Sequence, residues 1–231
     1  FQAHATHIVG GDITLKSVGG NNYEVTLRFY RDCSPGTAAF DNPITLGVYD
    51  QVTNVESFQF TLPLISTQIL VLGDSCFTPV GLCVEEGIYR DTITLNNNPN
   101  GYYLSWQRCC RNNIIQNIVL PGDAGMVFYV EFPDPLIVNS SPVFGSYPNA
   151  YLCNGQPNIQ NFSAIDNDGD SLAYFLTTPL NGNASAVTPI PTPTSGPYSS
   201  ITWQAPYGPA DMIGGPPPMS INPLTGILTA T

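Results

Sequence analysis

Three aspartates at alternate positions form the most chemically suggestive pattern of this sequence. Asp166, Asp168 and Asp170 lie in the segment SAIDNDGDSLAYFL. Carboxylate oxygens are ligands that Ca²⁺ prefers, and Gly169 allows the chain to bend so that the three carboxylates converge. No lysine or arginine lies within fifty residues of Asp168 to neutralise them. The pattern favours a calcium-binding turn.

Two other interpretations of the aspartate segment are a solvated turn before a strand and an acidic pair of an enzyme. The segment is not an EF-hand, because glycine stands at its fourth position and Thr177 replaces the bidentate glutamate. The only histidines are His4 and His7, and neither G-x-S-x-G nor H-E-x-x-H occurs. We therefore predict no catalytic residue and no enzyme, and we leave calcium and a bare turn as the two alternatives.

The elements that position this segment are predicted to be strands. Glycine (21) and proline (22) are too frequent for a helical protein. Tyr23, Val25, Leu27 and Phe29 alternate with polar residues, which is the period of a half-buried strand. Similar runs recur along the chain at short spacings, separated by turn signals such as NNNPNG and PGDAG. The sequence predicts an all-β protein.

Predicted strands are placed at 7–15, 22–33, 43–50, 56–64, 67–72, 87–95, 101–110, 113–120, 126–133, 158–165, 171–176, 199–205 and 219–231. The proline-containing segment FPDPLIVNSSPVF at 132–144 reads as a boundary. We predict two tandem β-sandwiches, residues 1–135 and 136–231. Proline tracts occupy much of the second region, so we expect it to lack its last strand or strands.

Six cysteines form an even set without any C-x-x-C motif, which favours disulfides over a zinc site. Continuing the alternation from Phe29 places Cys33 on the inward face, and Cys110 shares the inward face of Trp106. We therefore predict Cys33–Cys110 between the sheets, Cys76–Cys83 within a loop and Cys109–Cys153 near the boundary. Six cysteines allow 15 pairings, so several other sets stay open.

The net charge of −11 excludes several classes of partner. One lysine and five scattered arginines give no basic patch, so we predict neither nucleic-acid binding nor attraction to anionic membranes. No apolar run of 18 residues occurs, so no membrane insertion is expected. A chain that opens at FQAHATHIVGG looks like a secreted protein after removal of its signal peptide.

Several blocks of the sequence resemble a known family. THIVGGDI, YEVTLRFYRDC, CVEEGIYRDTITL, NNPNGYYLSWQRCCRN and IDNDGDSLAYFL are similar to the N-terminal part of large surface proteins of Bacteroidota. These are labelled gliding-motility-associated proteins and are exported by type IX secretion. The second half resembles cadherin-like and Ig-like repeats, in which D-x-D-G-D and N-P-x-T-G-x-L-T-x-T recur.

The resemblance implies extracellular display in an adhesin or a surface filament. It implies Ca²⁺ ligation by Asp166, Asp168 and Asp170, with Asn139 in the position of a linker ligand. The cadherin D-x-N-D-N linker is absent. We expect a structural module stiffened by disulfides and calcium. The alternatives are a carbohydrate-binding module that uses Tyr89, Tyr102 and Tyr103, and, third, a glycan-active enzyme.

The last expectation concerns self-association. An incomplete second sandwich would expose an unpaired sheet edge, which soluble proteins avoid. Either the chain is a fragment of a longer protein, or a second copy completes the sheet by strand addition. The N-terminal segment FQAHATHIVGG is the expected donor. Such a head-to-tail contact does not close on itself and would build a filament.

Overall fold

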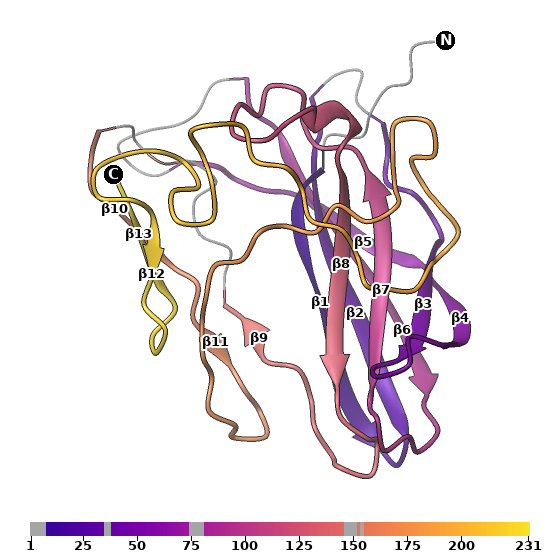
Figure 1. The fold of residues 1–231 in the computed structure, drawn as a ribbon. Helices are drawn as coiled ribbons and strands as arrows, with labels where there is room; N and C mark the ends of the chain where they lie inside the picture. Colours follow the sequence, from indigo (N-terminus) through magenta and orange to yellow (C-terminus); the bar gives the residue numbers. More distant parts are fainter. Residues whose placement is uncertain (1–7, 35–37, 74–80, 146–151, 153–154) are drawn as a thin grey trace.

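The computed structural model describes residues 8–34, 38–73, 81–145, 152 and 155–231. Two antiparallel four-stranded sheets pack against each other (Figure 1). The first sheet has the order β1 (Ile8–Gly19), β2 (Asn22–Asp32), β6 (Val84–Thr94) and β5 (Leu64–Ile69). The second has the order β4 (Glu56–Leu62), β3 (Ile44–Asp50), β7 (Tyr102–Cys109) and β8 (Gly125–Phe132).

The all-β prediction is confirmed. The helical structure among the described residues is a single 3₁₀ turn, η1 (Pro121–Asp123). None of the helical structure in that part of the chain has the length and apolar character needed to cross a bilayer. Both sheets contribute side chains to one hydrophobic core, which is the arrangement of a β-sandwich.

The core follows from the alternation along β2. Tyr23, Val25, Leu27 and Phe29 are all at most 2% exposed, as the period-two pattern predicts. Trp106 of β7 enters the core from the other sheet, with its ring centroid 5.3 Å from that of Phe29 and 5.4 Å from that of Phe128. Edge-to-face and tilted aromatic pairs of this kind add to the free energy of apolar burial.

Arginines of β2 pair with acidic residues of the neighbouring strand β6, Arg28 on the outer face and Arg31 on the face that carries Phe29, where it lies over the Phe40 ring. Arg28 lies 3.6 Å from Glu86, and Arg31 lies 2.5 Å from Glu85. These pairs join residues that the ladder places opposite or next to each other. Cross-strand charge pairs therefore support the register of β2 on β6 together with the core.

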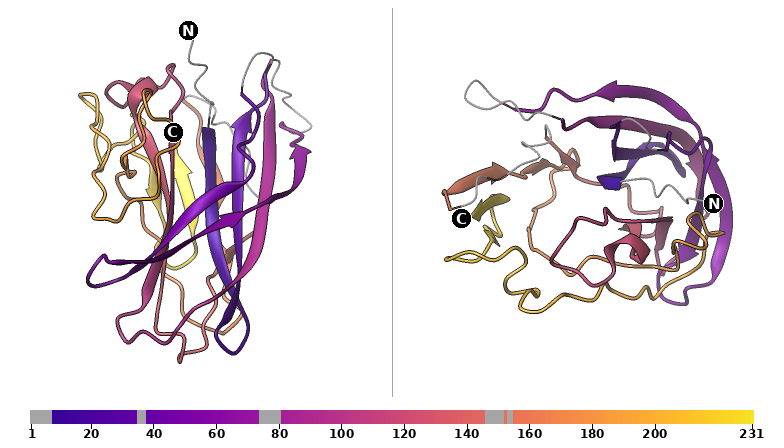
Figure 2. Two further views of the ribbon diagram at one scale, coloured as in Figure 1. Left: turned by 90° about the vertical axis from the view of Figure 1, so that its right-hand side faces the viewer. Right: turned by 90° about the horizontal axis from the view of Figure 1, so that it is seen from above.

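The strands β1 and β8 end their respective sheets and lie side by side on the same flank of the sandwich (Figures 1 and 2). They exchange no ladder hydrogen bonds, because β1 pairs with β2 and β8 pairs with β7. The sandwich is thus open at this seam. The chain after β8 returns to the same flank.

The region after residue 136 forms two small sheets. The strands β11 (Ala164–Ile165) and β9 (Val143–Phe144) make one, and β10 (Asn158–Asn161), β13 (Ile227–Ala230) and β12 (Ser220–Ile221) make the other. The expected boundary at 135/136 falls between β8 and β9. The division into two tandem sandwiches stays a prediction.

An extended segment between β11 and β12 packs on the first sandwich. The Cys109 N–H donates to the Pro189 carbonyl oxygen, and the Gly125 N–H donates to Asn181 Oδ1. Ile201 is buried in a small cluster with Ile118 and Ala124. The two regions are therefore joined along a broad surface as well as through their linker.

Three predicted strands are wrong. Residues 113–120 form turns, with Asn112 Oδ1 accepting the Ile114 N–H, and their extended part makes only an isolated bridge between Ile118 and Trp203. Residues 171–176 and 199–205 are extended without a ladder. Their apolar residues satisfy the pattern of a strand, but isolated backbone contacts, such as Tyr174 N–H to the Pro223 oxygen, replace a partner strand.

The predicted disulfide pairings are also wrong. The structure joins Cys33 to Cys83, and Cys109 to Cys110. These bonds exclude Cys33–Cys110, Cys76–Cys83 and Cys109–Cys153. Cys76 and Cys153 themselves lie outside the described residues.

Cys33 does not pair across the sandwich because the alternation along β2 ends before it. Phe29 and Tyr30 are both buried, and β2 ends at Asp32 opposite Val84. Cys33 and Cys83 continue this ladder by one position, and the Cys33 N–H donates to the Cys83 oxygen. Likewise β7 ends at Cys109, so Cys110 no longer follows the alternation of Trp106.

The Cys33–Cys83 bond gives a first prediction. It closes a loop with a sequence separation of 50 residues. Replacing both cysteines by alanine should lower the free energy of unfolding by about 2–4 kcal/mol, because the unfolded chain regains entropy. Urea unfolding under non-reducing conditions measures this, with reduced wild type as the matched comparison. Equal urea midpoints for oxidised wild type and the double variant would contradict it.

Candidate functional site

The linker between the two regions pairs with the outer edge of β1. The Ser141 N–H donates to the Leu15 carbonyl oxygen at 2.7 Å, and the Leu15 N–H donates to Ser141 Oγ at 3.0 Å. The Ser17 N–H donates to Ser140 Oγ at 3.2 Å. Two serines thus act partly through their backbone and partly through their hydroxyls to extend the first sheet. We call residues 139–142 the linker segment.

The aspartate loop, residues 166–170, follows β11 directly. Asp166 Oδ1 accepts the N–H groups of Asp168 (2.9 Å), Gly169 (3.0 Å) and Asp170 (3.2 Å). Gly169 has φ +89°, a conformation that glycine adopts without strain. An aspartate that accepts hydrogen bonds from N–H groups two to four residues later closes its own turn. Asp166 therefore organises the loop.

Asp168 connects the loop to the linker segment. Its Oδ2 accepts the N–H of Ser140 at 2.5 Å. The neighbouring Ser141 is the residue whose N–H bonds to β1, so the loop, the linker segment and β1 form one continuous chain of hydrogen bonds. The exposed aspartate loop thereby holds the linker segment against the sandwich.

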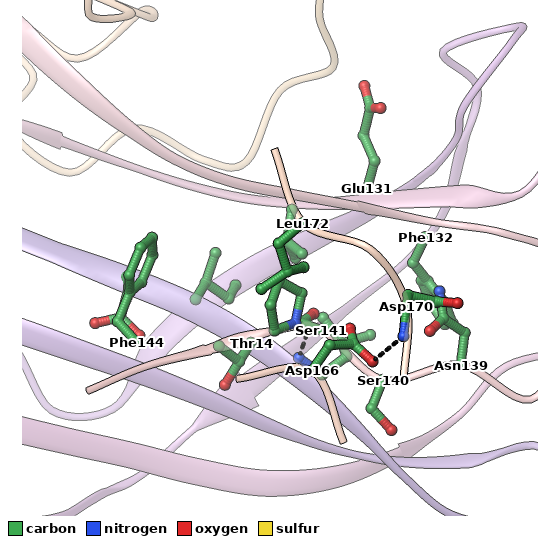
Figure 3. Close-up of a pocket in the computed structure, with 15 residues that line it drawn as sticks. Thr14, Glu131, Phe132, Asn139, Ser140, Ser141, Phe144, Asp166, Asp170 and Leu172 are labelled. Atoms are coloured by element: carbon green, nitrogen blue, oxygen red, sulfur yellow. Dashed lines mark hydrogen bonds between the residues drawn. The ribbon is translucent and has the colours of Figure 1, made fainter. Parts of the chain in front are cut away.

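A cavity of about 340 Å³ lies at this junction, and both Asp166 and Asp170 line it (Figure 3). Asn139, from the start of the linker segment, lies close to Asp170 in this view. The Oδ1 atom of Asn139 is buried and has no hydrogen-bond partner among the described residues. A buried acceptor without a donor costs about 1–3 kcal/mol. Asn139 thus combines a buried oxygen without a donor with a place in the lining of a ligand-sized cavity that carboxylates share.

Two further acids line the same cavity. Glu131 comes from β8, and its side chain points away from the aspartate loop (Figure 3). Asp12 comes from β1, and burial raises the pKa of its carboxyl, with Arg28 acting in the opposite direction. Burial and an opposite charge are separate causes of a pKa shift, and here the desolvation of Asp12 dominates.

The four residues predicted as metal ligands therefore come together only in part. Asp166 and Asp170 share a cavity with Asn139, while Asp168 contacts the adjacent Ser140. Within the described ranges, no three histidine, cysteine or acidic side chains are gathered closely enough to hold a metal ion. The amide of Asn139 and the carboxylates nevertheless offer the hard oxygen donors that Ca²⁺ takes.

The residues considered for other chemistry lie elsewhere. Tyr89, Tyr102 and Tyr103 are at most 6% exposed, so they do not form the carbohydrate-binding surface suggested from the sequence. His4 and His7 lie outside the described residues.

Sequence reasoning missed the roles of Ser140 and Ser141. A Ser-Ser pair before a proline carries no distinctive signal, because its pairing depends on which sheet edge is nearby. When the chain was compared with models of protein families, with curated proteins and with solved structures, none of them matched.

Asn139 gives a second prediction. Because its Oδ1 is buried without a donor, Asn139→Leu in buffer containing a chelator should keep or raise the free energy of unfolding, by up to about 2 kcal/mol. The matched control is Asn98→Leu. Asn98 donates to Asp50 and Gly101 and accepts from Asn100, so its loss should be destabilising. Chemical unfolding of both variants measures the difference, and a large destabilisation at Asn139 would contradict it.

Proposed function

We propose that this chain is a structural, non-enzymatic module of an extracellular surface protein, an adhesin or a surface-filament subunit, stiffened by disulfides and by calcium. One observation supports this most: the aspartate loop fastens the linker segment to the edge of β1. A joint of this kind transmits force between the two regions. The resemblance of the sequence to type IX-secreted surface proteins supports the extracellular location.

Calcium would act at this joint. Asp166, Asp168 and Asp170 would hold the ion from the loop, and Asn139 would hold it from the linker segment. The hydrogen bonds of the loop use Oδ1 of Asp166 and Oδ2 of Asp168. The other oxygen of each carboxylate accepts no hydrogen bond from the described residues. The ion would supply the missing partner of Asn139 Oδ1 and offset the repulsion among the carboxylates.

The calcium proposal gives a third prediction. A ligand that binds only the folded state at 100 times its Kd adds about 2.7 kcal/mol to the free energy of unfolding. Calcium should therefore raise the melting temperature of the second region, and chelation should reverse this and leave the first region nearly unchanged. Asp170→Asn and Asp168→Ala should abolish the response.

The matched control is Asp91→Asn, an exposed aspartate on β6 whose carboxylate accepts only a local N–H. It should keep the full calcium response. Differential scanning calorimetry with calcium or with a chelator measures all four proteins. If wild-type melting does not respond to either, the aspartate loop is a bare turn and calcium has no structural role.

Self-association completes the proposal. Among the described residues, no strand pairs with the outer edges of the sheet β10–β13–β12, and its strand β10 leaves Ile159 71% exposed. Exposed apolar side chains on an open edge favour the addition of a strand from another chain. We propose that the N-terminal segment of a second copy supplies this strand, which gives head-to-tail filaments. No part of this donor segment before Ile8 lies within the described residues.

The donor role gives a fourth prediction. Wild-type protein should form filaments that are visible by electron microscopy, and deletion of residues 1–6 should leave monomers. A matched control replaces the same six residues with a glycine-serine segment of equal length, which should also stay monomeric. Filaments that still assemble after the deletion would rule out the donor role.

A further inference from the structure

Arg111 differs from the other four arginines of the chain. Arg28, Arg31, Arg90 and Arg108 each form an ion pair with a carboxylate. No ion pair joins Arg111 to any acid among the described residues. Its Nε donates to the Gly125 oxygen and its Nη2 donates to the Leu180 oxygen, both at 3.1 Å. Two neutral carbonyls orient the guanidinium but leave its charge unmatched.

Arg111 is also largely withdrawn from water. Burial lowers its pKa to about 10, and no charged neighbour contributes to the shift. A partly buried charge without a counter-charge is costly, and a bound anion would remove that cost. The planar guanidinium matches a carboxylate, with which it can form two parallel hydrogen bonds.

Arg111 lines a cavity of about 440 Å³ in the open seam of the sandwich. One wall is the outer edge of β1 at residues 9–13, and another is β8 at residues 126–129. Phe144 and residues 177–180, from the second region, complete the lining. Arg111 lies next to the start of β8, because its N–H donates to the Ala124 oxygen. We call this space the seam cavity.

The β1 edge has unused backbone groups in the seam cavity. Alternate N–H and C=O groups of an edge strand point away from its partner strand. The linker segment occupies this edge at Leu15, where Ser141 pairs with it. Along residues 9–13 no other described segment forms a backbone hydrogen bond with it. Counting back from Leu15, whose groups face the linker segment, the backbone groups of Gly11 and Ile13 point outward.

We propose that the seam cavity binds an extended peptide strand that carries a carboxylate, supplied by a partner protein. The strand adds to β1 at residues 9–13, antiparallel, in line with the linker segment. Its carboxyl-terminal end then lies at the start of β1, beside Arg111. The backbone edge favours a peptide over an acidic sugar, and the unmatched guanidinium selects the acidic residue. This site does not depend on the calcium site proposed at the aspartate loop and the linker segment.

The test uses two fluorescently labelled peptides, Ac-TVTVE-NH2 and Ac-TVTVQ-NH2, which differ only in charge at the last residue. Binding to the full chain is measured by fluorescence anisotropy. The glutamate peptide should bind about tenfold to a hundredfold more tightly, the range of a charge-assisted hydrogen bond. The outward-facing backbone N–H groups of Gly11 and Ile13 should become protected from hydrogen exchange.

Two variants assign the effect to Arg111. Arg111→Met should remove the preference for glutamate, and Arg111→Lys should retain part of it. The matched control is Arg90→Met, which removes an exposed arginine that pairs with Glu24 on another face, and it should bind like wild type. If Arg111→Met fails to fold, the two peptides on wild-type protein still decide the question.

Three results would overturn the proposal. The first is no binding of either peptide at 1 mM, and the second is equal binding of both. The third is binding of sodium glucuronate in the seam cavity without protection of residues 9–13, which would assign the site to acidic sugars instead. Each of these leaves the calcium and filament proposals untouched, because they concern a different cavity and a different sheet.

Discussion

The peptide groups on the outer edge of β1 point away from β2. Much of this structure depends on which segments form hydrogen bonds with them. An unpaired strand edge invites contact with other chains. At Leu15 and Ser17 the linker segment covers the edge with Ser140 and Ser141. Asp168 fixes Ser140 from the other side. The second region is therefore anchored to the first sheet by its own backbone.

A few residues earlier, the linker segment does not cover this edge of β1. The chain turns away from β1 after Pro142 to form β9, which pairs with β11 instead. Residues 9–13 are left facing β8 across an open seam. Arg111 lies in this seam without a counter-charge. The outer edge of β1 thus has a stretch that the linker segment covers, which suits load bearing. It also has an uncovered stretch in the seam cavity, which suits recognition.

The sequence predicted the parts that depend on local pattern. The alternation of Tyr23 to Phe29 identified β2 and its buried face, because side-chain direction in a strand has a fixed period. The local pattern gave wrong predictions where the structure of a segment depends on its partner in the fold. Residues 171–176 have a strand-like pattern but no partner strand, and Cys33 pairs according to the ladder between β2 and β6.

The site shows the same division. The aspartate spacing predicted a turn, and Asp166 does close one on itself. The family resemblance implied that Asn139 is a linker ligand, and only the folded chain shows that it lines a cavity with Asp166 and that its oxygen lacks a donor. Nothing in the sequence distinguishes Arg111 from Arg108. The difference is that Asp41 lies within 2.7 Å of Arg108.

Hydrogen exchange of the Ser140 and Ser141 amides tests most directly whether the aspartate loop holds the linker segment on β1. Both should exchange slowly and together with the β1 core in wild type, and Asp168→Ala should accelerate Ser140 first. Exchange of both amides at the rate of an exposed loop would contradict the account.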